Sequence, residues 1–344
     1  MNIHISHALR LSIAAWLSFS IAVLSGIENA YWAAMPVWVI SQSNRGMMLQ
    51  RGAYRLIGTL IGALLGLAIL KATNQAWIII AIISLTVFIA IFMMRISQGT
   101  KGYAPQMMAV TIIIILAPAL MHTQYAWELA LSRIQCTFIG VIVVTLITAR
   151  YTQTTADEVW YRELLTWRSK SLINDPAQKR QDKINALLFA TLASAGVLLC
   201  ACFFYLSGWK AGEIVTLGTC IFTMALASLK KPYDMALTMF IGVVAGACIA
   251  FLYRFSVQPY FLSPQLIILT IIPFFLLGGF LRCWVRTAAP ALDGNMCFLL
   301  ASQAGMSAVP VKTAMNECLA LMLAVALVSC AYRLLLRPDS SPVR

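Results

Sequence analysis

Five ionisable residues lie inside or beside long apolar runs, and they are the residues of this sequence best suited to chemistry: Arg55, Arg133, Glu213, Asp234 and Glu317. Charged side chains are costly in an apolar environment, so those found there usually serve a function. An arginine can hold a carboxylate through paired hydrogen bonds. A carboxylate in a medium of low dielectric constant can load and release protons near neutral pH. We therefore expect the two arginines to contact an anionic substrate and the three carboxylates to carry protons, with Glu317 the leading candidate.

Each of these charges also has a plainer explanation. A long charged side chain at the end of an apolar helix can bury its stem and extend its head to the membrane surface. Trp32 and Trp209 carry the same ambiguity: together with Tyr31 and Trp38 they could stack on a substrate ring, or they could form the aromatic belt of a membrane interface. Both interpretations stay open, and Trp32 and Trp209 are candidate substrate-binding residues.

The sequence lacks the motifs of the common enzyme classes. The three histidines, His4, His7 and His122, fall outside the middle of any apolar run. The patterns H-E-x-x-H, G-x-S-x-G and G-x-x-x-x-G-K-S/T are absent. The nine cysteines lie in or at the edge of apolar runs, where cysteine behaves as a small hydrophobic residue. We therefore expect no catalytic site, no metal site and no cofactor.

The composition indicates an integral membrane protein. Of 344 residues, 61% are hydrophobic and 11% are charged, whereas a soluble domain has about 25% charged residues. The mean hydropathy is +0.83. Many apolar runs approach the ~20 residues that a helix needs to cross the hydrocarbon core of a bilayer. The sequence therefore predicts an all-α polytopic membrane protein with twelve transmembrane helices, at residues 5–25, 29–44, 54–71, 75–94, 102–120, 127–149, 186–206, 210–229, 233–253, 263–281, 289–307 and 313–335.

The distribution of positive charge supports this number of spans. If both termini are cytoplasmic, the cytoplasmic segments hold 20 of the 25 Lys and Arg residues. Such an excess on the cytoplasmic side is typical of membrane proteins. The net charge of +13 therefore needs no nucleic-acid partner, because the basic residues sit at helix ends and form no clustered patch.

Two similar halves make up the chain. We expect six-helix membrane repeats at residues 1–150 and 185–344, joined by a cytoplasmic linker at residues 151–184. Trp32 near the start of the second span corresponds to Trp209 near the start of the eighth. Repeats with an even number of spans share one orientation, as in transporters whose two halves rock about a site between them.

The linker contains the segment TADEVWYRELLTWRSKSLIN, which can form an amphipathic helix on the cytoplasmic membrane surface. A solvated linker is the alternative. Just inside the third and ninth spans, Tyr54 and Arg55 correspond to Tyr233 and Asp234. We therefore expect Arg55 and Asp234 to form a symmetric pair at the cytoplasmic mouth.

Glycines recur at helical spacing behind this pair. Gly58, Gly62 and Gly66 share one face of the third span, and a one-residue shift aligns Gly62 and Gly66 with Gly242 and Gly246. Small residues at this spacing let a second helix approach closely. We expect these glycines to pack helices within the bundle; a contact face between two copies of the chain is the alternative.

Several of these features together resemble a known family. The order is Trp32, then Arg55-x-x-Gly58-Thr59-x-x-Gly62-x-x-x-Gly66, then Arg133 before a Phe-Ile-Gly motif. The pattern is similar to that of the aromatic acid exporter and fusaric acid resistance-like family of bacterial inner-membrane proteins. Members usually carry a large cytoplasmic domain between the halves, whereas this chain has a short linker and resembles a compact form.

The resemblance implies efflux of small organic or aromatic carboxylic acids, or related toxic compounds, driven by the proton gradient. It also implies a periplasmic membrane-fusion adaptor as partner and a location in the inner membrane. Two alternatives stay open: a membrane scaffold subunit of an envelope complex that transports nothing, and a passive anion channel.

Overall fold

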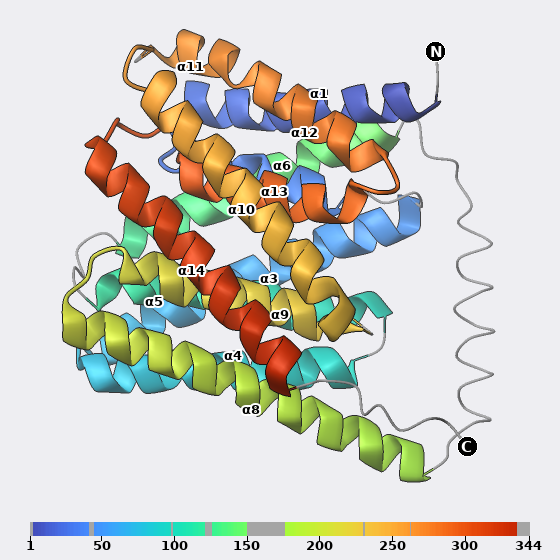
Figure 1. The fold of residues 1–344 in the computed structure, drawn as a ribbon, viewed down its shortest axis with the longest axis vertical. Coiled ribbons are helices and arrows are strands. Elements are labelled where there is room, and N and C mark those ends of the chain that lie inside the picture. Colours follow the sequence, from blue (N-terminus) through green and yellow to red (C-terminus); the bar gives the residue numbers. More distant parts are fainter. Residues whose placement is uncertain are drawn as a thin grey trace.

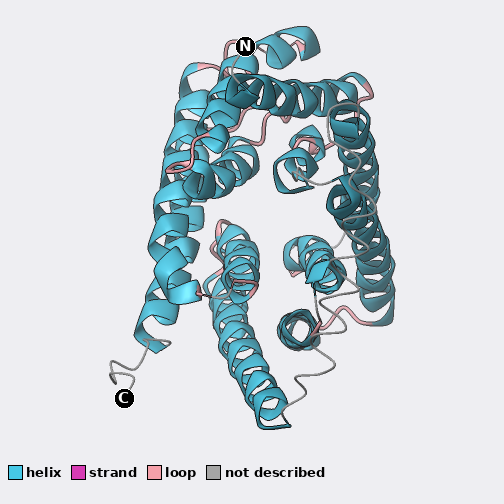
Figure 2. Cartoon of the chain, turned by 90° about the vertical axis from the view of Figure 1, so that its right-hand side faces the viewer, coloured by secondary structure: helices cyan, strands magenta, loops and turns pink. Residues whose placement is uncertain are grey.

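The structure is a computed structural model in which described residues form helices, turns and loops without a strand (Figures 1 and 2). The expected amphipathic helix of the linker lies outside the described residues. The described ranges are 3–40, 45–97, 99–120, 126–149, 176–229, 231–261 and 263–335.

Helices cover all twelve expected spans. In the first half they are α1 (Ile3–Leu24), η1 (Ala30–Ala33), α2 (Met35–Ile40), α3 (Arg45–Ala72), α4 (Ala76–Ile96), η2 (Gly99–Gly102), α5 (Tyr103–Ala119) and α6 (Ala126–Ala149). In the second half they are α8 (Pro176–Ser207), α9 (Gly212–Ala227), α10 (Pro232–Ser256), α11 (Pro264–Thr270), α12 (Ile272–Cys283), α13 (Ala288–Ser302) and α14 (Val311–Leu335).

Nine helical segments of the described chain are long and apolar enough to cross a membrane, which confirms a polytopic all-α protein. The other three expected spans are shorter: η1 with α2, α9, and α13. Most of their residues are buried among other helices. A helix surrounded by protein does not have to match the bilayer thickness, because its ends meet other protein groups instead of lipid.

Equivalent helices pack in the same way in the two halves. α3 runs along α5, and α10 runs along α13. At one edge α4 packs against α8, and at the opposite edge α12 packs against α1 (Figure 1). Each of these edge contacts joins a helix of one half to a helix of the other half, so both halves contribute to one bundle.

The bundle is apolar outside, and its largely hydrophobic interior contains scattered polar side chains. On α3, for example, Arg55 and Thr59 are buried, whereas Leu60 and Leu64 are exposed. Many buried hydroxyl groups donate to the carbonyl one helical turn earlier, as Thr111 does to Met107 O at 2.9 Å. An apolar outer surface suits lipid, and polar groups inside mark the interior as the place for function.

Glycines allow close helix contacts in both halves. A Cβ atom at Gly58 or Gly62 would lie 2.5 Å from Ala104 O or 2.6 Å from Met108 O, so α3 and α5 touch through their backbones. Added Cβ atoms at two glycines of α10 would collide with the carbonyl oxygens of Pro290 and Gly294 on α13; these glycines are Gly242 and Gly246. Gly66 differs, since its nearest neighbour is the flexible side chain of Ile115, at 3.1 Å.

This packing corrects the expected alignment of the halves. Gly58 faces the first turn of α5 and Gly242 faces the first turn of α13, which aligns them with an offset of 184 residues (242 minus 58). The same offset places Met239 at the position of Arg55. The expectation that Asp234 is the counterpart of Arg55 is therefore wrong. It relied on aligning the neighbouring tyrosines, and it needed a one-residue shift between the tyrosines and the glycines that the helix packing does not show.

Candidate functional site

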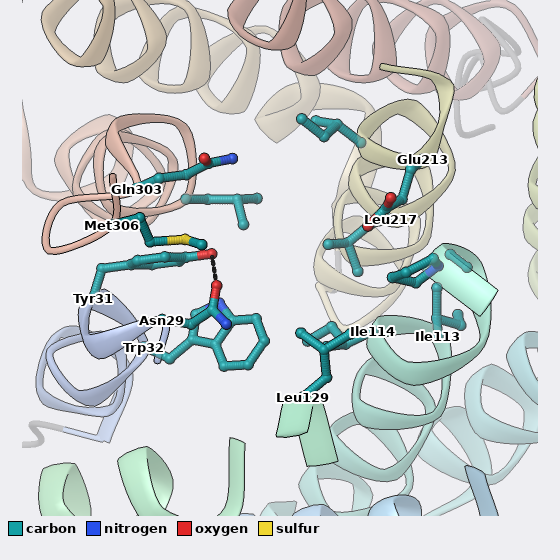
Figure 3. A pocket seen from close by; sticks show the side chains of 14 residues that line it. Asn29, Tyr31, Trp32, Ile113, Ile114, Leu129, Glu213, Leu217, Gln303 and Met306 are labelled. Atoms are coloured by element: carbon teal, nitrogen blue, oxygen red, sulfur yellow. Dashed lines mark hydrogen bonds between the residues drawn. The ribbon is translucent and has the colours of Figure 1, made fainter. Parts of the chain in front are cut away.

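A cavity of about 150 Å³ lies where α5 ends and α6 begins. One wall is aliphatic and comes mainly from α5, α6 and α9; Glu213 projects from this side (Figure 3). The facing wall is aromatic and polar, with Tyr31, Trp32, Gln303 and Met306. Because η1 and α9 come from different halves, the cavity lies between the halves of the chain.

Backbone strain is concentrated at this cavity. Two non-glycine residues of the described chain have positive φ, Asn29 at 55° and Gln303 at 46°, and both line the cavity. Residues held in this conformation tend to lie at functional sites. Tyr31 supports one of them, since its hydroxyl donates to Asn29 Oδ1 at 3.1 Å.

A polar network leads from Gln303 into the second half. Gln303 Nε2 donates to Glu317 Oε2 at 3.3 Å. Arg254 Nη1 donates to the same oxygen at 2.5 Å, and also to Ala301 O at 3.1 Å. The Arg254 side chain is 2% exposed and that of Glu317 is 18% exposed. The charge of Glu317 is thus compensated by a buried partner.

The first half contains buried charge without such compensation. The Arg133 guanidinium lies over the Trp32 ring, 5.1 Å from its centroid, and its Nε is buried without a hydrogen-bond partner. Arg55 is also buried and is close enough for the two positive charges to repel each other. Arg55 Nη1 donates to the Tyr103 hydroxyl at 2.7 Å. Among the described residues, Arg254 and Glu317 form an ion pair. No described carboxylate pairs with Arg55 or with Arg133.

Of the remaining candidate residues, Glu213 lines the cavity, whereas Asp234 and Trp209 do not. Glu213, in the first turn of α9, lines the cavity and makes no hydrogen bond or ion pair with a described residue. Asp234 is exposed in the first turn of α10, where a carboxylate is stabilised by the helix dipole. Trp209 precedes α9 and is not part of the cavity wall, whereas Trp32 is.

Sequence reasoning missed several residues of the site. Asn29 and Gln303 have no motif that marks them, because their importance arises from backbone conformation. Arg254 directly follows the expected span at residues 233–253, where a basic residue is common and gives no sign of a partner. The 184-residue offset would have been informative, since it pairs Arg133 with Glu317 and Asn29 with Glu213. In the described part of the chain, no three His, Cys, Asp or Glu side chains gather as a metal ion would require.

Comparisons with known proteins place the chain among membrane proteins. It is 26% identical over 136 residues to the inner membrane protein YccS of Escherichia coli K12, covering 39% of this chain and 18% of YccS. It is 25% identical over 139 residues to the uncharacterized transporter YdhK of the same strain, covering 40% of this chain and 21% of YdhK. An uncharacterized transporter of Gluconobacter oxydans, GOX0755, is 31% identical over 70 residues, covering 20% of this chain and 10% of that protein.

These matches therefore span about a fifth or less of each relative. No solved structure matches the chain. The model of the fusaric acid resistance protein family matches twice, over residues 4–167 and over residues 161–344. The two matches together cover the whole bundle, and the chain belongs to the fusaric acid resistance protein family.

Proposed function

We propose that this protein exports small aromatic or related organic carboxylates across the bacterial inner membrane. The observation that carries the proposal is the buried guanidinium of Arg133, which has no carboxylate partner among the described residues and lies over an aromatic side chain of the cavity wall. A buried charge without a partner is strongly unfavourable. An anionic ligand would supply the missing charge.

The cavity suits a ring with one carboxylate. A volume of about 150 Å³ is enough for a benzene-sized ring. Trp32 and Tyr31 offer aromatic faces and edges, which favour offset or edge-to-face contact with such a ring. Arg133 is not among the residues that line the cavity, but its guanidinium lies over the Trp32 ring of the wall. From there it would attract the carboxylate, with Arg55 as a second positive charge nearby.

Transport by relative motion of the halves is supported by the arrangement of the helices. The family model matches each half separately, and the glycine contacts of α3 with α5 recur between α10 and α13. We propose membrane repeats at residues 1–150 and 185–344, a linker at residues 151–184, and both termini in the cytoplasm. These close backbone contacts lie within each half, so they would hold each half together as a unit that moves during alternating access.

Proton coupling and a periplasmic adaptor complete the proposal. Three carboxylates are candidates to carry the proton: Glu317, Glu213 and Asp234. Their surroundings differ, so we do not expect them to contribute equally. The family description, resistance to fusaric acid, favours outward transport. A membrane-fusion adaptor would then carry the exported acid onward, and a second copy of the chain is a further possible partner.

Everted membrane vesicles test the function directly. The assay imposes a proton gradient and measures accumulation of a panel of labelled aromatic acids. Wild-type vesicles should accumulate at least one of them, and Arg133→Gln should abolish this. Arg286→Gln, at an exposed position, is the matched control and should transport normally. Absence of any flux would favour the scaffold, and flux without gradient dependence would favour the passive channel.

A further inference from the structure

We propose that Glu213 takes up a proton when an anion enters the cavity, so that the cavity holds the anion and the proton together. The inference depends on the proposed function for the class of its ligand. It assigns the proton to one carboxylate among the three candidates and fixes the sign of the coupling between proton and substrate.

Glu213 differs from the other two candidate carboxylates in its surroundings. Glu317 is held by Arg254 and Gln303, and Asp234 is exposed at a helix end. Glu213 projects into the cavity from α9, across from the Tyr31 and Gln303 side chains (Figure 3). No described residue donates a hydrogen bond to it, so nothing in this part of the chain fixes its charge.

The charged and titratable groups around Glu213 do not neutralise it. Tyr31 on η1 and Glu317 on α14 act on it electrostatically, and neither supplies a positive charge. Arg254 on α10 is already paired with Glu317. Lys210, in the turn before α9, and Lys312, in the first turn of α14, are both exposed.

The other helices packed against α9 add no charge at this level. The residues of α4 and α5 at this end of the bundle are uncharged. The corresponding end of α8 contributes Cys200, Cys202 and Tyr205. Cys200 lies within hydrogen-bond distance of the Thr219 hydroxyl, and the Tyr205 ring packs on Trp77.

A bound anion would therefore meet an uncompensated carboxylate. In a cavity of about 150 Å³ the two negative charges would be less than roughly 10 Å apart. With an effective dielectric constant of about 20, their repulsion weakens anion binding by roughly 10- to 100-fold. Protonation of Glu213 removes this repulsion and turns an acceptor into a hydrogen-bond donor for the ligand.

Thermodynamic linkage then sets the direction of the effect. If a proton on Glu213 strengthens anion binding, the anion strengthens proton binding by the same factor. Anion affinity should therefore rise as the pH falls.

Calorimetry on the purified full chain can measure this proton uptake. Benzoate is titrated into the detergent-solubilised protein in buffers of different ionisation enthalpy, at neutral and alkaline pH. Wild-type protein should take up close to one proton per anion at the pH where uptake is greatest. Glu213→Gln should take up none and should bind benzoate roughly 10- to 100-fold more tightly than wild type at alkaline pH.

The matched control is Glu128→Gln, an exposed glutamate in the first turn of α6 that lies outside the cavity wall. It should keep wild-type proton uptake. Wild-type binding without proton uptake would overturn the inference, even if Glu213→Gln fails to fold, and so would uptake that persists in a folded Glu213→Gln protein. Failure of the proposed function has a different signature: neither benzoate nor any related carboxylate binds, or binding survives Arg133→Gln unchanged.

Discussion

Arg133 on α6 and Glu317 on α14 occupy corresponding positions in the two halves, yet their surroundings are opposite. Glu317 is paired with Arg254 from the neighbouring helix, and that pair also caps the end of α13 through Ala301 O. Arg133 has an aromatic ring beside it and a second arginine nearby. The second half therefore neutralises its buried charge from within, whereas the described residues of the first half offer Arg133 no carboxylate partner.

The same contrast occurs at the start of the two short helices. Asn29 and Glu213 are related by the same offset and both line the cavity. Tyr31 fixes the amide of Asn29 by a hydrogen bond, but no described residue fixes the carboxylate of Glu213. The two halves thus share a backbone arrangement but place different charges at corresponding positions.

Breaking the Arg254–Glu317 pair should have the largest effect on stability. Glu317→Gln leaves Arg254 buried without a counter-charge, and we expect a loss of about 3–5 kcal/mol. Thermal unfolding in detergent measures it. The double variant Arg254→Met with Glu317→Leu should regain most of this loss, because apolar side chains can replace a buried pair. A Glu317→Gln protein as stable as wild type would show that the pair does not hold α10 to α14.

Removing Arg133 should weaken anion binding without lowering stability. Arg133→Met deletes a buried charge that has no carboxylate partner among the described residues, so stability should stay equal or rise. Anion affinity should fall by about 10- to 100-fold, which is the usual worth of a hydrogen bond to a charged group. Benzoate binding and thermal unfolding are measured on the same sample. If the variant were as unstable as Glu317→Gln, the two halves would not differ in the way described above.

Hydropathy and charge predicted most of this fold, because long apolar helices and the positive-inside pattern are local properties of the sequence. The helices α9 and α13 could not be recognised as short, since burial by protein and burial by lipid select similar residues. Their depth in apolar runs makes Arg133 and Glu317 candidate functional residues. Their partners could not be identified, since Trp32 and Arg254 reach them only through the packing of helices distant in sequence.

Glycine substitutions test whether the backbone is as symmetric as the packing suggests. Gly62→Ala and Gly246→Ala each place a Cβ against a carbonyl oxygen of the partner helix, and we expect each to cost about 1–3 kcal/mol. Gly66→Ala should cost less, because the Ile115 side chain can move. Gly196→Ala is the control, since its nearest neighbour would be 3.9 Å away and alanine favours a helix. Unequal losses at Gly62 and Gly246 would contradict equivalent packing in the two halves.

The smallest effect should come from the hydrogen bond that distinguishes Asn29 from Glu213. Tyr31→Phe keeps the ring in the cavity wall but removes the donor to Asn29 Oδ1, so we expect a loss of about 1 kcal/mol in thermal unfolding. Tyr260→Phe, at a residue 75% exposed, should lose nothing. Benzoate affinity should change less than in Arg133→Met, because the aromatic surface and both arginines remain. A loss of affinity as large as that of Arg133→Met would mean that the strained conformation of Asn29, and not the buried positive charge, controls the anion end of the cavity.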